Sequence, residues 1–343
     1  MDSRERVFAS LAHESPDRPP VSATYTPEAA RTLRDAYGCH EDDLGYVMGN
    51  DLIKTTVGIE TSYHYKDDPT YTCKFGILWR NVSNASGAYT EIVKGPLYGD
   101  KAALDSYKMP DPMDGDWYVP VKAAVERYGR EKFIVGSCQC SIFEMAWYLR
   151  GLKDFLVDLL DDEDYANTLL DKAADFSQKA GLNMIDCGVD MVWLGDDVAT
   201  QRSMLISMDT WRKYFRDRFA KIFEAYRAKK KNIVIAYHSC GNCEAILDDM
   251  TEIGLDVINP IQPLAMDPYY IKKRYGKSLT LFGAIDIQRL LPFGTVDEIC
   301  RTVREYKRTL GENGGYILSP AHNIQADTSL ENIQAFYGEA LRH

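Results

Sequence analysis

The sequence has no apolar run long enough to span a bilayer, and its first residues lack the apolar core of a secretion signal. We therefore expect a cytoplasmic protein without a membrane partner. Basic residues are outnumbered: 40 lysines and arginines stand against 51 acidic residues, for a net charge of −11 and a pI near 5.1. Because an acidic surface is repelled by nucleic-acid phosphates, no nucleic-acid partner is expected either.

Glycine-rich phosphate-binding motifs are absent too. No G-x-G-x-x-G or G-x-x-x-x-G-K-[ST] pattern follows an apolar run, which disfavours nucleotide binding. The chain has eight cysteines. Without a secretion signal they are expected to be free thiols or metal ligands rather than disulfides, as would suit a reducing or anaerobic cytosol.

Short apolar runs recur along the whole chain. Amphipathic stretches such as 152–179, 208–229 and 296–310 separate most of them. The expected strands are 20–25, 51–57, 133–138, 191–195, 233–236, 257–261, 279–283 and 316–319. Strand–helix alternation without a break in composition predicts an α/β fold, with one (β/α)₈ TIM barrel over residues 1–343 rather than two domains.

Residues 58–98 differ from the rest because they are aromatic, alternating and broken by turns. The pattern predicts antiparallel hairpins inserted after the second strand. They could form a mere edge sheet or an aromatic wall for the substrate, since loops after barrel strands line the active site. On the second interpretation Tyr63, Tyr65 and Trp79 bind substrate.

Polar residues after the strands should meet at one end of a barrel. His238 and Cys240 follow the strand 233–236, and residues two apart in an extended chain project to the same side. The bland interpretation is a core histidine beside buried thiols. The sharper one adds His322, after the last strand, as a third zinc ligand, leaving a fourth position open to substrate. Cys243 is a competing ligand but is expected to pack inward.

Two further sets of residues follow the expected strands. Asp196 and Asp197 could orient an imidazole, ligate the metal directly or cap the next helix, and capping is favoured for at least one. Asp286 could orient substrate or cap its own helix. The candidate catalytic or orienting residues are Asp196, Asp197, Gln262 and Asp286. The other candidate substrate-binding residues are Tyr25, Cys138, Glu144, Gln201 and Asn323.

Several motifs together resemble the uroporphyrinogen decarboxylase superfamily, and more closely its corrinoid-dependent methyltransferase branch. The resemblance covers essentially the whole chain. The motifs are Arg4-Glu-Arg-Val, His13-Glu-Ser-Pro-Asp-Arg-Pro-Pro, Gly195-Asp-Asp, His238-Ser-Cys-Gly, Gly283-Ala-Ile-Asp and Pro320-Ala-His-Asn-Ile.

The resemblance has implications for the chemistry. Decarboxylases of the superfamily hold a porphyrinogen through an arginine-bearing segment after the first strand, whereas here no arginine occurs between residue 21 and Arg31. Methylcobamide:coenzyme M methyltransferases hold zinc through H-x-C and a cysteine near the C-terminus, and here His322 takes the third place. That departure suits relatives that demethylate methoxylated aromatics.

The predicted function is therefore a zinc-dependent methyltransferase that moves a methyl group from a small methoxylated, aromatic substrate to the cobalt of a partner corrinoid protein. Zinc would act as a Lewis acid on the ether oxygen. Methylation of a thiol such as coenzyme M ranks second, because no basic cluster is expected at the barrel mouth. A tetrapyrrole enzyme, a metal-free binding barrel and a homodimer remain open alternatives.

Overall fold

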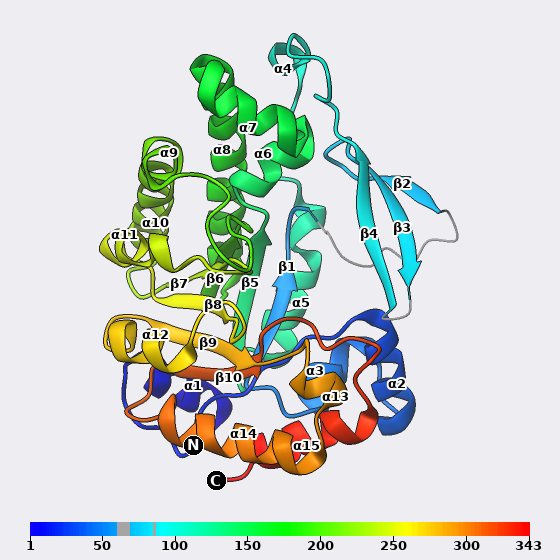
Figure 1. The fold of residues 1–343 in the computed structure, drawn as a ribbon, viewed down its shortest axis with the longest axis vertical. Helices are drawn as coiled ribbons and strands as arrows, with labels where there is room; N and C mark the ends of the chain where they lie inside the picture. The colour runs from blue at the N-terminus through cyan, green and yellow to red at the C-terminus, as the bar shows by residue number, and fades with distance from the viewer. Residues whose placement is uncertain (60–68, 85–86) are drawn as a thin grey trace.

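The computed structural model describes residues 1–59, 69–84 and 87–343. Its main sheet has seven parallel strands in the order β1-β5-β6-β7-β8-β9-β10, and in Figure 1 they curl around a common centre with helices outside. The strands are β1 (Leu52–Thr56), β5 (Phe133–Gln139), β6 (Met191–Gly195), β7 (Val234–His238), β8 (Val257–Ile261), β9 (Thr280–Ile285) and β10 (Tyr316–Pro320). This is a TIM-barrel-like α/β fold.

The helices alternate with these strands, and α5, α8 and α14 pack on the outer face of the sheet. The helices are α1 (Ser3–Leu11), α2 (Pro27–Tyr37), α3 (Leu44–Val47), α4 (Ala103–Ser106), α5 (Val119–Tyr128), α6 (Phe143–Arg150), α7 (Leu152–Asp161), α8 (Glu163–Cys187), α9 (Met208–Trp211), α10 (Asp217–Lys229), α11 (Leu247–Glu252), α12 (Pro268–Tyr275), α13 (Leu290–Phe293), α14 (Val296–Thr309) and α15 (Leu330–Ala340). The predicted helix 152–179 is two helices, because Asp162 ends α7 and its side chain caps α8.

Seven of the eight predicted strands form, and the segment 20–25 does not. It makes only isolated parallel bridges, including Val21 with Leu318 of β10. The backbone N–H of Asp51, just before β1, also donates to the Val21 carbonyl at 2.8 Å. The side chain of Asn50 bonds both backbone groups of Ala23 and so replaces ladder partners there. The segment thus bridges the two edge strands of the sheet without being a regular strand.

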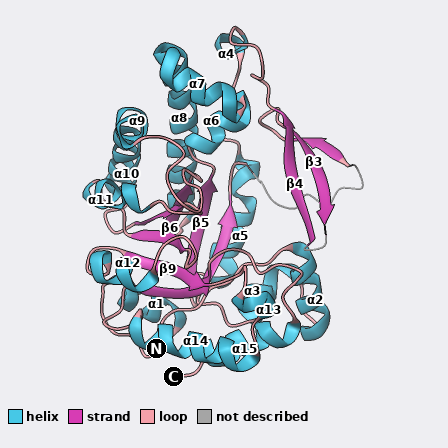
Figure 2. Cartoon of the chain, viewed as in Figure 1, coloured by secondary structure: helices cyan, strands magenta, loops and turns pink. Residues whose placement is uncertain are grey.

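A separate antiparallel sheet follows β1 in the chain. It contains β2 (Thr70–Thr72), β3 (Leu78–Asn84) and β4 (Gly87–Lys94), and Figure 2 shows β3 and β4 standing apart from the main sheet. Trp79 of β3 is buried, with its ring 5.5 Å from that of Tyr148 on α6. Tyr63 and Tyr65 lie outside the described residues.

The inside of the curled sheet has its own apolar cluster, which includes Phe133, Met191, Trp193 and Phe282. Val7 of α1 belongs to the same cluster and is fully buried. Since α1 contacts β5 and β10 at this cluster, the N-terminal helix closes one end of the barrel interior. Any ligand must then enter from the other end, where the strands terminate.

Charged pairs cover this closed end. Asp51 is fully buried and accepts hydrogen bonds from Arg6 at 2.8 Å and from Arg18 at 2.7 Å. Asp190, just before β6, accepts two from Arg4 at 2.6 and 2.8 Å. The family-like motifs at the start of the chain therefore supply ion pairs that hold the fold together.

Among the residues that the structure describes, no helix is both long enough and apolar enough to cross a lipid bilayer.

Candidate metal centre

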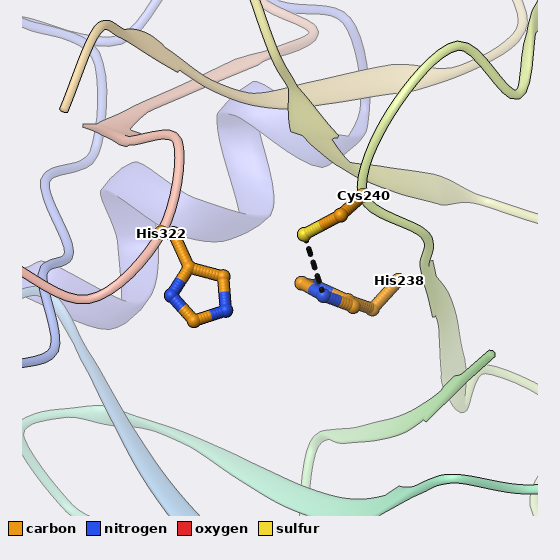
Figure 3. A group of neighbouring side chains, drawn as sticks. All are labelled: His238, Cys240 and His322. Atoms are coloured by element: carbon orange, nitrogen blue, oxygen red, sulfur yellow. Dashed lines mark hydrogen bonds between the residues drawn. The ribbon is translucent and has the colours of Figure 1, made fainter. Parts of the chain in front are cut away.

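Three predicted ligands converge at the open end of the sheet. His238 ends β7, Cys240 follows two residues later, and His322 comes just after β10. One ligand atom from each lies within 4.8 Å of the other two, and the sulfur of Cys240 is 3.5 Å from Nε2 of His238 (Figure 3). The structure thus brings two imidazoles and a thiol to one point.

Asn259 of β8 orients the first imidazole. It is paired with His238 in the sheet, and its Oδ1 lies 2.6 Å from Nδ1 of the histidine. Because the amide nitrogen of Asn259 donates to the Phe282 carbonyl, Oδ1 is the atom that faces the ring, and Nδ1 must donate to it. The lone pair of Nε2 is then free and directed toward Cys240, as a metal ligand requires.

The protonation of the three side chains suits a cation. Desolvation lowers the pKa of His238, and desolvation together with the neighbouring His238 lowers that of His322 to about 4. Both imidazoles are therefore neutral near pH 7, with lone pairs available. Burial and then the charge of Asp197 raise the pKa of Cys240 well above its usual value, so a cation is needed to hold its thiolate. This nitrogen–sulfur donor set fits zinc.

Two glycines make room for the ligands. Gly195 of β6 is paired with His238, and a Cβ at this position would lie 2.6 Å from that of the histidine. Gly241 has a φ of 85°, and a Cβ there would lie 2.4 Å from the carbonyl oxygen of Thr200. Because neither position accepts a side chain without a shift of the backbone, both glycines fix the ligand geometry.

Hydrogen bonds hold the turn that carries Cys240. The Cys240 N–H donates to Asp197 at 2.7 Å, and the Gly241 N–H donates to the side chain of Gln262 at 2.8 Å. Gln262 was a candidate for contacting substrate, but its side-chain oxygen is used by this turn. Cys243 is fully buried, as predicted, with its sulfur 3.9 Å from the Ser239 carbonyl.

A cavity of about 350 Å³ lies beside the three ligands. His238 and His322 line it, and Asp197 reaches to 3.6 Å from Nε2 of His238. Its walls include the aromatic rings of Tyr148, Trp193 and Phe282 and the polar side chains of Thr24, Lys54, Thr56, Gln139, Glu144, Asn259, Ser319 and Asn323. Of the predicted substrate-binding residues within the described part of the chain, Glu144 and Asn323 line this cavity.

Glu144 lies in the cavity wall, where its carboxyl group is a weaker acid than usual. Tyr148 donates a hydrogen bond to it at 2.8 Å. Burial, followed by the charges of Asp197 and Asp196, raises the pKa of Glu144 well above its usual range. A carboxyl group that stays protonated at neutral pH can donate a proton.

Lys54 is the main residue that the sequence analysis missed. Its ammonium nitrogen lies 4.3 Å from the centre of a Trp193 ring and donates to Gln139 at 3.2 Å. Burial lowers its pKa to about 8. A signal was present, because Leu52, Lys54 and Thr56 alternate along β1 and all line the cavity. The cavity lining therefore contains one basic side chain, although not the basic cluster whose absence was expected.

Two of the candidate catalytic residues cap helices. Asp196 is fully buried and accepts from the N–H groups of Ile142, at 3.0 Å, and Glu144, at 2.9 Å. It therefore caps α6, which follows β5, whereas Asp196 itself follows β6. Asp286 accepts from Gln288 at 2.8 Å, next to α13, and does not line the cavity. Asp286 thus caps its own helix, as predicted, whereas Asp196 caps an earlier helix and not the next one, for which its cap was predicted.

Four predicted substrate-binding residues do not line the cavity. The sulfur of Cys138 faces Ser177 of α8, because alternation along β5 turns it to the outer face. Trp79 is covered by α6, and Gln201 lies exposed in a turn. Tyr25 bonds the hydroxyl of Tyr337. Each lies near a strand end or loop as predicted, but tertiary packing decides where its side chain points.

Comparison with known proteins identifies the family to which this chain belongs. The family model of uroporphyrinogen decarboxylase (URO-D) matches residues 82–343, more than half of the chain, and the chain belongs to that family. This confirms the resemblance drawn from the motifs.

The chain is also similar to individual proteins named as methyltransferases. The chain is 29% identical to the methylcobamide:CoM methyltransferase MtaA of Methanosarcina barkeri over 63% of its length and 60% of the relative's. It is 23% identical to the MtbA enzyme of Methanosarcina acetivorans over 96% of its length and 95% of the relative's. The match to a methylated-thiol–coenzyme M methyltransferase of Methanosarcina mazei is 25% identical and covers 63% of that protein. The chain thus aligns with less than two thirds of the length of several of these relatives.

A solved structure shares the fold over the full chain. It is a methyltransferase from Methanosarcina mazei, with a TM-score of 0.75 and 21% identity, covering 99% of this chain and 98% of that one.

Proposed function

We propose that the protein is a zinc-dependent methyltransferase that moves a methyl group between a small substrate and the cobalt of a corrinoid protein. The observation that carries the proposal is the convergence of His238, Cys240 and His322 beside a cavity. Relatives named as methylcobamide methyltransferases support it. Closure of the sheet into a full (β/α)₈ barrel, with the antiparallel sheet as an insertion in this one domain, belongs to the same proposal. The homodimer and the cytoplasmic location stay predictions.

The roles of the chain's own residues follow from their contacts. His238, Cys240 and His322 would hold zinc, which supplies Lewis acidity toward an oxygen or sulfur atom when bound. Asn259 keeps Nε2 of His238 unprotonated for this purpose. Glu144, whose raised pKa favours the protonated form, would donate a proton to the oxygen that leaves the methyl group.

A methoxylated aromatic compound is our first candidate for the methyl donor. Trp193, Tyr148 and Phe282 give the cavity apolar ring surfaces, and its volume of about 350 Å³ suits a single substituted ring. These rings take the role predicted for Trp79, whereas Tyr63 and Tyr65 lie outside the described residues and stay predictions. Asp197 and Asn323 lie in the same walls and would orient the ring substituents.

A thiol such as coenzyme M is the second candidate, as methyl acceptor. Two observations favour it: the relatives' names include coenzyme M, and Lys54 places a positive charge in the cavity. A tetrapyrrole is disfavoured because the residues lining the cavity include one lysine and no arginine, too little positive charge for its many carboxylates.

The decisive experiment starts with metal analysis of protein purified without a tag. We expect about one equivalent of zinc. Methyl transfer is then followed spectroscopically in both directions, from methoxyarenes to cob(I)alamin and from methylcobalamin to coenzyme M. Less than a tenth of an equivalent of zinc, with none taken up on titration, would overturn the proposal in favour of a metal-free binding barrel. If only coenzyme M reacts, the second candidate replaces the first.

A further inference from the structure

The cavity contains a lysine that no carboxylate of the described residues neutralises. Lys54 projects inward from β1, and among the described residues its ammonium group forms no ion pair; the contacts found are the neutral Gln139 side chain and the Trp193 ring. Asp197, which also lines the cavity, is engaged with the backbone N–H of Cys240. A charge in such a place costs desolvation free energy that a ligand of opposite charge would recover.

Trp193 links this lysine to the metal centre. Lys54 lies over the indole at 4.3 Å, and the His238 ring stacks near it at 6.1 Å. The ammonium group and the proposed zinc ligand therefore both lie next to one indole, and both line the same cavity. Thr56, two residues further along β1, adds a hydroxyl on the same inner side of the cavity.

We propose that Lys54 is a specificity residue that binds a single oxyanion, a carboxylate or a sulfonate, at the end of the substrate opposite its reacting heteroatom. The inference rests on the proposed function for the identity of the reacting end. It predicts a substrate class: small molecules with a methylated or thiol heteroatom at one end and one oxyanion at the other. A planar anionic ring could pack on the indole while its charge meets the ammonium group.

The test measures binding without any methyl transfer. Zinc-loaded protein is titrated calorimetrically with two pairs of probes of matched shape: benzoate against benzamide, and benzenesulfonate against benzenesulfonamide. We expect wild type to bind at least one anion tenfold or more tightly than its neutral partner, and the preferred pair tells carboxylate from sulfonate. Equal binding within both pairs would overturn the inference without any variant.

Variants locate the preference. Lys54→Met should abolish it with zinc content unchanged, and Lys54→Gln serves if the methionine variant folds poorly. The matched control is Lys272→Met, which removes a lysine whose pKa burial also lowers to about 8 but whose nitrogen donates to the Gly314 carbonyl, outside the cavity lining. A preference that survives both Lys54 variants would show that zinc or another group binds the anion, and the assignment would be wrong.

The outcome is separable from that of the methyl-transfer assay. Protein that transfers no methyl group but prefers an anion through Lys54 retains this inference and loses the proposed function. Protein that demethylates anisole as fast as methoxybenzoate retains the function and loses the inference.

Discussion

The two ends of the main sheet differ in whether their buried charged side chains form ion pairs. At the closed end, Asp51 is satisfied by Arg6 and Arg18, and Asp190 by Arg4. At the open end, Lys54 has no carboxylate partner among the described residues. Only three positions separate Asp51 from Lys54, so one short stretch of chain serves both ends.

The difference indicates what each end is for. Paired charges at the closed end stabilise the fold and leave little free charge for a ligand. Unpaired or neutralised groups at the open end cost stability, which is expected where a ligand completes the site. Glu144 and His322 fit this pattern, because burial holds the first protonated and the second neutral. Variants at the two ends should therefore fail in different ways.

The largest effect is expected from Asp51→Asn at the closed end. Removing the carboxylate charge leaves Arg18 without a carboxylate partner among the described residues and Arg6 with Asp17 alone, which should lower the free energy of unfolding by about 3–5 kcal/mol. Denaturant titration measures this, and zinc content per folded molecule should not change. The control is Asp105→Asn, an exposed residue on α4. A loss of zinc without a loss of stability would break the contrast between the two ends.

Next comes Cys240→Ala at the open end. We expect normal folding, zinc below a tenth of an equivalent, and at least a hundredfold loss of methyl transfer, because only two imidazoles remain. Circular dichroism, metal analysis and the cobalamin assay measure the three quantities. Cys300→Ala, on α14 with its sulfur near the Ala335 carbonyl, should retain all three. Full activity in the Cys240 variant would show that the ligand assignment is wrong.

Glu144→Gln tests the uncharged acid in the cavity wall. The rate of demethylation should fall about tenfold to a hundredfold, because the amide cannot supply a proton to the leaving oxygen. In wild type only the protonated carboxyl is active, so the rate should fall as pH rises through its raised pKa, and the variant should lack this alkaline decline. Glu126→Gln, on the exposed side of α5, is the control. An unchanged pH–rate profile would remove Glu144 from the reaction.

The smallest effect concerns the stability of Lys54→Met. Between pH 8 and about 10.5 the unfolded chain binds more protons than the folded one, because burial lowers the pKa of Lys54 to about 8. Wild type should therefore gain stability across this window relative to the variant. At pH 7 the variant should be the more stable by about 1–3 kcal/mol, opposite in sign to Asp51→Asn. A destabilised variant would mean that Lys54 has a stabilising partner.

Much of the site could be predicted from local pattern. The spacing of His238 and Cys240 at the end of an apolar run places both side chains on one side, and His322 follows the last strand. Parallel strands that end on one face bring such residues together whatever their distance in sequence. Seven strands were also predictable from local pattern, because short apolar runs between amphipathic stretches are typical of buried parallel strands.

Other features depended on contacts that sequence does not encode locally. Whether Cys138 faces inward or outward depends on strand register, which apolar residues on both faces conceal. Asp196 caps a helix after a different strand, and the segment 20–25 loses its regular pairing to the side chain of Asn50. Lys54 could have been found by asking why one charge interrupts an otherwise uncharged strand.

Gly195 shows that a binding centre can depend on an atom that is missing. Its hydrogen occupies the place where any larger substituent would collide with the Cβ atom and the backbone of His238. Gly195 supplies no ligand atom, but its lack of a side chain allows the paired strand to place His238 where it lies. Replacement of Gly195 by alanine should tilt the imidazole of His238 and lower the affinity for a cation, although no ligand residue has been changed.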